Sequence, residues 1–139
     1  MHDVWETRVR YAETDAQGIV FYGTYFTYQD ETFSQFLREV DYSWEDMADA
    51  GWEVHVVHTE IDYRSQAEFG DELVCGIRAS AINESSLTFD WRCRRRDGPV
   101  VAEGNIVHAA VDEDGETTRV PQPFRDAVVE YQETPPDPV

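Results

Sequence analysis

The chain contains no lysine, and this absence defines its surface. All 11 basic residues are arginines, against 29 acidic residues, so that 139 residues carry a net charge of −18. Nucleic-acid binding depends on Lys and Arg neutralising phosphates, which argues against DNA or RNA as a partner. Repulsion at this charge destabilises a compact chain unless salt screens it, as at 1 M salt, where the Debye length is about 3 Å. We therefore expect a halophilic protein.

Long hydrophobic runs are also missing. No stretch approaches the roughly 20 apolar residues of a membrane span, and the first residues, MHDVWETRVRY, lack the apolar region and cleavage site of a signal peptide. We expect a cytoplasmic protein with no membrane partner.

Cysteine is scarce, and Cys75 and Cys93 lie in strand-like segments without metal-ligand spacing. Two buried thiols are the favoured interpretation, and a disulfide is the lesser one.

Metal and nucleotide motifs are absent from the sequence. His55 and His58 are three residues apart on an expected strand, so they point to opposite faces, and His2 and His108 add no ligand cluster. There is no G-x-S-x-G, G-x-G-x-x-G or P-loop pattern. We predict no metal and no cofactor, with the histidines as ordinary core or surface residues.

The patterning predicts a single α+β domain over residues 1–131, followed by a proline-rich acidic tail at 132–139 that favours disorder. Apolar residues recur at three- and four-residue steps from 22 to 40, which indicates one long helix, interrupted by Gln29 and Asp30. Ser43 opens a short helix that Gly51 ends.

The rest of the chain is rich in strands. Period-two alternation predicts strands at 5–11, 53–64, 72–82, 86–96, 100–111 and 117–120, with a final helical turn or two after Pro121. One helix against one curved antiparallel sheet is the economical packing. Such a sheet usually completes its burial by dimerising.

The segment 10–33 contains the clearest chemical signal. Asp15 is followed by a turn ending in Gly18, an apolar run and the start of the long helix. The first N–H groups of a helix lack intrahelical partners and carry about half a positive charge, so they can polarise a thioester carbonyl. A nearby carboxylate could then attack the carbonyl carbon or activate water. An ordinary turn carboxylate is the competing interpretation of Asp15, and Glu13 is expected to be a solvated charge.

Residues 14–26, TDAQGIVFYGTYF, match without gaps the pattern of the 4-hydroxybenzoyl-CoA thioesterase family, which this segment resembles. Weaker similarity continues at 61–63, 70–73 and 85–87. The resemblance implies a hotdog fold, with one long central helix wrapped by a five- to six-stranded antiparallel sheet. It also implies a homodimer or homotetramer with the site at the subunit interface.

By this resemblance the chain hydrolyses an acyl-CoA with an aromatic or a short- to medium-chain acyl group. Asp15 would be nucleophile or general base, the backbone N–H of Tyr22 the donor to the carbonyl, and Gly18 the residue that lets the turn close. Some relatives have His at position 22, so no imidazole assistance is expected here. The residues expected to contact substrate are Phe21, Tyr25, Phe26, Gln29, Asp30, Ser86, Arg92 and Arg94.

Several alternatives stay open. Gln29 and Asp30 fit a wet helix face or a dimer contact as well as an acyl pocket. The arginines within 92–96 could bind CoA phosphates or pair with carboxylates such as Asp90. The family often has basic residues just before position 86, where this chain has Asn-Glu-Ser. This chain must therefore bind the nucleotide of CoA in a different way. A non-catalytic acyl-CoA-binding protein is the second function considered. A hotdog hydratase is disfavoured because no histidine lies near the helix start.

Overall fold

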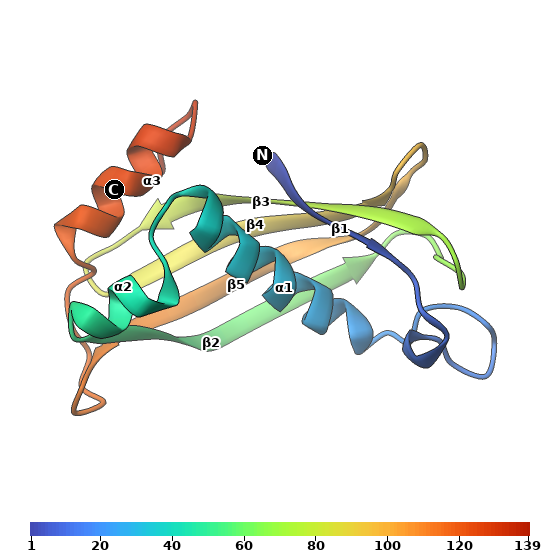
Figure 1. Ribbon diagram of the computed structural model, residues 1–139, viewed down its shortest axis with the longest axis horizontal. Helices are drawn as coiled ribbons and strands as arrows, with labels where there is room; N and C mark the ends of the chain where they lie inside the picture. The colour runs from blue at the N-terminus through green and yellow to red at the C-terminus, as the bar shows by residue number, and fades with distance from the viewer.

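The computed structural model describes all 139 residues. Five strands form one antiparallel sheet in the order β1-β3-β4-β5-β2, and the long helix α1 crosses one face of it (Figure 1). The short helices α2 and α3 lie at one end of the sheet, and the loop before α1 lies at the other. The elements are β1 (His2–Arg8), η1 (Tyr11–Glu13), α1 (Thr24–Glu39), α2 (Trp44–Asp49), β2 (Trp52–Tyr63), β3 (Glu72–Ile82), β4 (Ser86–Arg95), β5 (Val100–Asp112) and α3 (Gln122–Tyr131).

This arrangement is the hotdog fold that the sequence predicts. The long helix, the short helix and four of the strands lie within two residues of their predicted bounds. Ser43 caps α2 as predicted, because its Oγ accepts from Asp46 N–H at 3.0 Å while the Asp46 carboxylate accepts from Ser43 N–H at 2.8 Å. Gly51, with φ of 79°, ends the helix. Cys75 and Cys93 are buried free thiols on neighbouring strands.

Three predicted elements were wrong. The first strand lies at His2–Arg8 instead of 5–11, because its pairing with β3 ends at Arg8 and the chain then turns through η1. The predicted strand at 117–120 makes one isolated bridge, from Thr117 to Val111, and no strand. The last helix has ten residues instead of a turn or two, since Phe124 and Val128 bury a full apolar stripe.

The last residues of the chain lie against β3. The side-chain amide of Gln132 donates to Ala79 O and accepts from Ala79 N–H, at 3.1 and 2.7 Å. Asp137 N–H donates to Ser80 O, and Ile82 N–H donates to Pro138 O. The segment that composition assigns to a disordered tail therefore contributes backbone hydrogen bonds.

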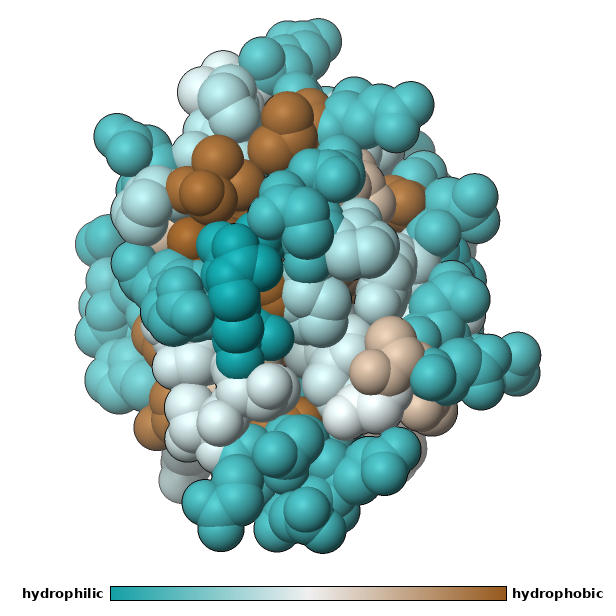
Figure 2. All heavy atoms as spheres, turned by 90° about the vertical axis from the view of Figure 1, so that its left-hand side faces the viewer, coloured by the Kyte–Doolittle hydropathy of each residue, from teal (hydrophilic) through white to brown (hydrophobic).

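Figure 2 shows the end of the molecule that carries α2 and α3 as mostly hydrophilic, with hydrophobic residues in small separate patches. No helix is long and apolar enough to cross a membrane.

The two edges of the sheet differ in their protection. The β1 edge is seven residues long, has an irregular register between Asp3 and Trp5, and carries charged side chains, all of which discourage pairing with another chain. The β2 edge also has an irregular register, between Val56 and His58, and carries exposed charges such as Glu53 and Glu60, but it is 12 residues long, and Val56 and Val57 at its centre are 53% and 62% exposed. Its length and its exposed valines distinguish the β2 edge from the β1 edge.

We expect Gly104→Ala to destabilise the fold. A Cβ at this position of β5 would lie 1.8 Å from Glu60 O on β2, so the two strands would have to separate. The expected loss is at least about 3 kcal/mol of unfolding free energy, measured by urea denaturation. In Gly98→Ala the nearest atom is a side-chain carbon of Arg95 at 3.1 Å, and the loss should be far smaller. Equal losses in the two variants would contradict this account.

Candidate active site

Asp15 lies at the tip of a short hairpin that precedes α1. Its N–H donates to Ile19 O at 2.9 Å, and Gly18 N–H donates back to Asp15 O at 3.0 Å. Gly18 has φ of 79°, the left-handed conformation that closes a three-residue hairpin loop. One carboxylate oxygen of Asp15, Oδ1, accepts from Gln17 N–H at 2.8 Å. The turn thus fixes the carboxylate, which is half-buried.

Glu13 ties the base of this hairpin to the start of α1. Its carbonyl oxygen accepts from Phe21 N–H at 2.9 Å and from Thr24 Oγ1 at 3.4 Å. Its side chain is buried, which corrects the expectation of a solvated charge, and accepts from Arg10 N–H and Nη2, both at 2.8 Å. Burial raises the pKa of Glu13, but the hydrogen bonds from Arg10 outweigh it and hold that pKa below its usual value. Glu13 lies two positions before Asp15 in the chain, so its contacts hold the start of α1 next to the Asp15 hairpin.

The N–H of Tyr22 is available at that entrance. It donates to no backbone acceptor, while Tyr22 O accepts from Tyr63 Oη at 3.0 Å. The residue before α1, Gly23, supplies no side-chain cap, and the first turn is held by backbone bonds, from Thr24 N–H to Phe21 O at 2.9 Å and from Phe26 N–H to Gly23 O at 3.2 Å, which leave Tyr22 N–H free. The ring of Tyr22 is 65% exposed and lies against Phe21, with ring centroids 4.5 Å apart. Its ring is thus outside the core, and its main chain is fixed.

A cavity of about 240 Å³ lies between α1 and the strands β2 and β5, and we call it the helix cavity. It contains three predicted substrate residues, Phe26, Gln29 and Asp30. Gln29 is 3% exposed, its Oε1 accepts from Thr59 Oγ1 at 2.6 Å, and its Nε2 has no partner. The lining residues are Phe26, Gln29, Asp30, Phe33, Val56, Thr59, Ile106 and His108.

Other predicted contacts do not join this cavity. Tyr25 is 3% exposed and packs in the core edge-on to Tyr28 and Tyr63, and burial raises its pKa. Ser86 begins β4, at the end of the sheet near α2 and α3, far from the Asp15 loop (Figure 1). Within a single chain, Ser86 therefore lies apart from the hairpin.

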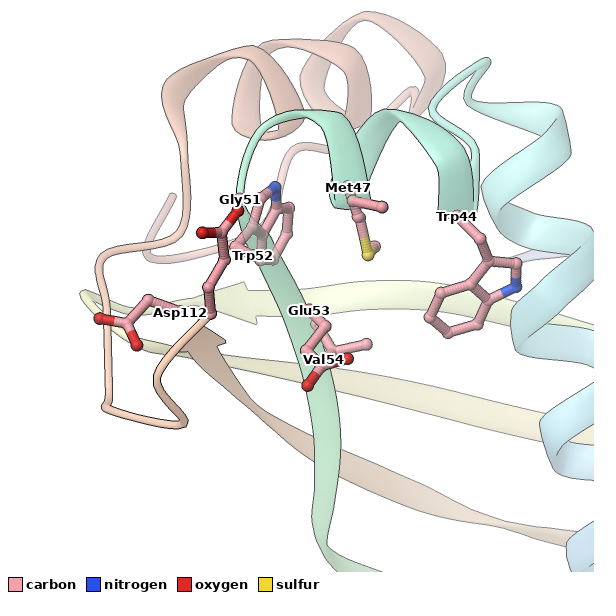
Figure 3. Close-up of a pocket in the computed structure, with 9 residues that line it drawn as sticks. Trp44, Met47, Gly51, Trp52, Glu53, Val54 and Asp112 are labelled. Atoms are coloured by element: carbon pink, nitrogen blue, oxygen red, sulfur yellow. The ribbon is translucent and has the colours of Figure 1, made fainter.

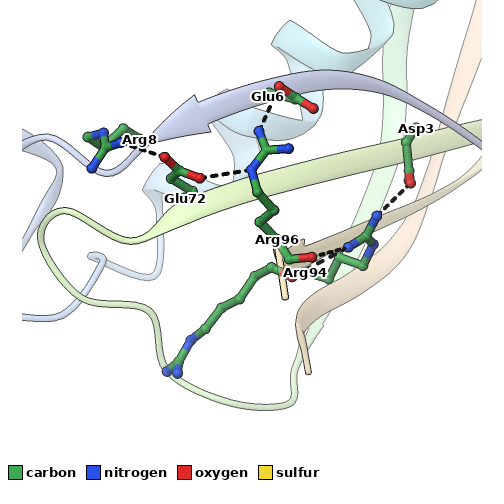
Figure 4. A network of polar contacts seen from close by, with 7 residues as sticks. Asp3, Glu6, Arg8, Glu72, Arg94 and Arg96 are labelled. Carbon is green, nitrogen blue, oxygen red and sulfur yellow. Dashed lines mark hydrogen bonds and ion pairs between the residues drawn. The ribbon is translucent and has the colours of Figure 1, made fainter. Parts of the chain in front are cut away.

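Arg92 and Arg94 of β4 lie on the sheet face opposite α1. Trp91 faces the helix, since its Nε1 donates to Thr32 Oγ1 at 3.1 Å, so Arg92 and Arg94 point the other way. Arg94 donates to Asp3 at 2.8 Å, and Arg96 pairs with Glu6 and Glu72 at the same distance (Figure 4). Arg94 and Arg96 therefore pair with carboxylates, which was one of the two alternatives for these arginines, but their partners are not Asp90. Asp90 lies 3.6 Å from Arg78.

Comparison with known proteins decides the family. The model of the thioesterase-like superfamily matches residues 9–130, most of the chain. The chain belongs to the thioesterase-like superfamily.

Three proteins similar to this chain show the degree of similarity in sequence and structure. A putative esterase of Aquifex aeolicus is 29% identical over 86% of this chain and 91% of its own. The acyl-CoA thioester hydrolase YbgC of Escherichia coli O157:H7 is 23% identical over 78% of this chain and 81% of its own. A crystal structure of the hypothetical protein TT1821 from Thermus thermophilus has a TM-score of 0.85 at 26% identity, covering 94% of this chain and all of that one.

Sequence reasoning missed His108 in this thioesterase-like chain. It lies on β5 between the buried Ile106 and Ala110, so period-two alternation already places it on the inner face. The imidazole stacks on Phe33 with centroids 4.2 Å apart, and its Nδ1 has no hydrogen-bond partner. Burial lowers the pKa of His108 to about 4, so the ring is neutral at pH 7.

This burial predicts a loss of stability in acid. An unfolded histidine has a pKa near 6.5, so the contribution of neutral His108 is complete above that pH and is lost as the pH falls towards 4. Wild type should lose about 1.4 kcal/mol per pH unit across this window relative to His108→Phe, which keeps an aromatic ring. Urea unfolding of both proteins at pH 7, 6 and 5 measures the difference. Parallel pH curves would contradict it.

Proposed function

We propose that the protein hydrolyses an acyl-CoA thioester to the free acid and CoA. The observation that supports this most directly is the link through Glu13, whose carbonyl joins the Asp15 hairpin to the helix entrance where Tyr22 N–H is unpartnered. Acyl transfer needs a nucleophile or base next to a donor for the oxyanion, and these two groups supply both. Membership of the thioesterase-like superfamily agrees with this chemistry.

In the proposed reaction the thioester oxygen accepts a hydrogen bond from Tyr22 N–H, which stabilises the negative charge that develops on it. The Asp15 carboxylate either attacks the carbonyl carbon, giving an acyl anhydride that water then hydrolyses, or takes a proton from the attacking water. Both routes release CoA as its thiol. Neither route needs a metal or a cofactor.

We place the acyl group in the helix cavity, which begins one turn beyond Tyr22. Phe26 and Phe33 give it apolar walls, and Gln29 and Asp30 add polar groups. Its volume of about 240 Å³ suits an aromatic ring or a short to medium chain. Arg92, the arginine of this strand without an ion pair, stays a predicted phosphate contact, and Arg94 would have to leave Asp3 to act as one.

We further propose that the working form is a homodimer, or a pair of such dimers, joined through β2. Asp15 lies outside the helix cavity of the single chain, as expected if a second copy completes the cleft. The exposed valines at the centre of β2 supply the apolar contact, and antiparallel pairing would extend the sheet across both copies.

A panel of acyl-CoAs, assayed by release of free thiol at low and at molar salt, tests this function. Turnover of at least one aromatic or short- to medium-chain thioester, with higher activity at molar salt, is the expected result. Binding of acyl-CoA without any thiol release would instead support the second candidate, a non-catalytic acyl-CoA-binding protein. The salt comparison also tests the halophilic interpretation, because screening should stabilise a chain of net charge −18.

A further inference from the structure

Four polar side-chain atoms of the chain are buried without a hydrogen-bond partner, and two of them belong to residues that line the helix cavity. These two atoms are Nε2 of Gln29 and Nδ1 of His108, and each residue is only 3% exposed. Folded proteins leave few buried polar groups unpaired, because a buried group without a partner costs stability. Two such groups on one cavity therefore indicate a partner that comes from outside the chain.

The other two atoms, Tyr28 Oη and Arg95 Nε, have charged neighbours within the chain. Tyr28 lies beside the buried carboxylate of Glu13, and Arg95 Nε lies 3.6 Å from the carboxylate of Asp71. Neither residue lines the helix cavity. The indication of an external partner is therefore confined to Gln29 and His108.

A larger cavity gives no comparable indication. It has a volume of about 380 Å³ and lies under α2, where Trp44 and Met47 enter it from the helix and Glu53 and Asp112 enter it from the strand ends (Figure 3). None of its lining residues has a buried polar side-chain atom without a partner. Size alone does not specify a ligand, whereas the unpaired groups of the helix cavity do.

Gln29 and His108 are neighbours on the wall of the helix cavity. Gln29 and Phe33 are four residues apart on α1, so they share one face of the helix, and the imidazole of His108 stacks on the Phe33 ring at 4.2 Å. Gln29 Oε1 accepts from Thr59 Oγ1 at 2.6 Å. Thr59 pairs with Ile106 of β5, and His108 is the next residue on the same face of that strand. The two unpaired groups therefore adjoin the same volume.

This polar pair lies away from the reacting groups. Gln29 follows Tyr22 by seven residues, a rise of roughly 10 Å along the helix. Phe26, an apolar wall of the cavity, lies between them in the chain. A group bonded to Gln29 is thus at the far end of an acyl chain whose thioester carbonyl lies at Tyr22.

A hydroxyl matches both members of the pair. Gln29 Nε2 is a donor, and the neutral ring of His108 has one donor and one acceptor nitrogen. A hydroxyl can accept from the amide and either donate to the imidazole or accept from it. A hydrocarbon end leaves both groups unpaired. A carboxylate end is disfavoured, because the ring carries no positive charge and Asp30 lines the same cavity.

We propose that Gln29 and His108 select acyl groups that carry a hydroxyl at the end remote from the thioester, as a phenol or as a terminal alcohol. This inference rests on the proposed function and narrows the acyl group that the proposed function leaves open. Phe26 and Phe33 contact the hydrocarbon part of that group, and the amide and imidazole bind its hydroxyl.

Two matched pairs of substrates test the selection by release of free thiol. One pair is 8-hydroxyoctanoyl-CoA and octanoyl-CoA, and the other is 4-hydroxyphenylacetyl-CoA and phenylacetyl-CoA. In at least one pair we expect the hydroxylated member to have a kcat/KM higher by about tenfold or more, mainly through KM, because the other member leaves two buried groups unpaired. The pair that shows the preference distinguishes an alcohol from a phenol. A smaller preference in both pairs would overturn the proposal.

Two substitutions attribute the preference to these residues. Gln29→Met keeps the chain length and His108→Phe keeps the ring, while each removes the polar atoms, so each should reduce the preference at least about threefold. Gln35→Met is the matched control, because Gln35 lies on α1 outside the cavity and bonds to Arg38 and Glu39. A preference that neither cavity variant reduces, or that the control reduces equally, would overturn the proposal. If one cavity variant fails to fold, the other gives the same test.

Binding without turnover separates this inference from the proposed function. Asp15→Asn, which should bind the thioesters without cleaving them, is titrated with both members of each pair by calorimetry. In the preferred pair we expect at least about tenfold tighter binding of the hydroxylated member. A smaller difference in both pairs would show that water satisfies Gln29 and His108, and would overturn the inference even for an active enzyme. A tenfold preference in binding by a protein whose wild type releases no thiol would support the inference while rejecting hydrolysis.

Discussion

Asp15→Asn should reduce kcat/KM for acyl-CoA hydrolysis at least about a hundredfold, the scale of a lost acid–base or nucleophilic group. An amide is neither a base nor a competent nucleophile at neutral pH. Its side-chain oxygen can still accept the hydrogen bond that Asp15 Oδ1 takes from Gln17 N–H at 2.8 Å. The hairpin should therefore survive the substitution, and the loss should appear in turnover, with folding and subunit association preserved.

The matched control is Asp114→Asn. Asp114 is an exposed turn carboxylate at the opposite end of the sheet, so its removal changes the net charge equally without touching the hairpin. Thiol-release kinetics, thermal unfolding and light scattering on the three proteins separate a chemical effect from a loss of structure. Full activity in Asp15→Asn would reject the site assignment, and equal losses in both variants would point to a general charge effect.

The sequence predicted the architecture well where local patterns act alone. The 3.6-residue stripe at 22–40 and the alternation at 72–82 each correspond to a single element, so their bounds agree closely with α1 and β3, although β3 is buried on both faces from Leu73 to Ile77. The predicted strand at 117–120 failed because strand formation needs a neighbour along its whole length, and Thr117 finds only Val111. Patterning along the chain does not contain that information.

The candidate site was predictable only in part, for the same reason. The turn residues Asp15 and Gly18 are local signals and lie where the sequence puts them. Tyr25 shares the helix with Phe26 but faces the core, because one residue step rotates a side chain by 100° about the helix axis. The carboxylate that holds Arg94 comes from Asp3, 91 positions away, and no local pattern identifies such a partner.

The prediction with the broadest consequence concerns the β2 edge. Val57→Glu places a carboxylate where the proposed interface is apolar, at a position outside the helix cavity, so a dimer would bring two of them together near its axis. Unscreened like charges in an interface cost several kcal/mol, and the acidic chain offers no lysine to neutralise them. Light scattering should show wild type at a multiple of the chain mass of 16.1 kDa and the variant at that mass.

Activity should fall with the mass, at least about a hundredfold, because a lone chain leaves the proposed cleft at Asp15 open. Val129→Glu is the control, since Val129 is 41% exposed on α3, away from β2, and its substitution adds the same kind of charge. A monomeric variant with full activity would show that one chain holds the entire site. A variant that keeps the wild-type mass would move the interface away from β2, and a second copy would then have to complete the cleft at Asp15 through another surface.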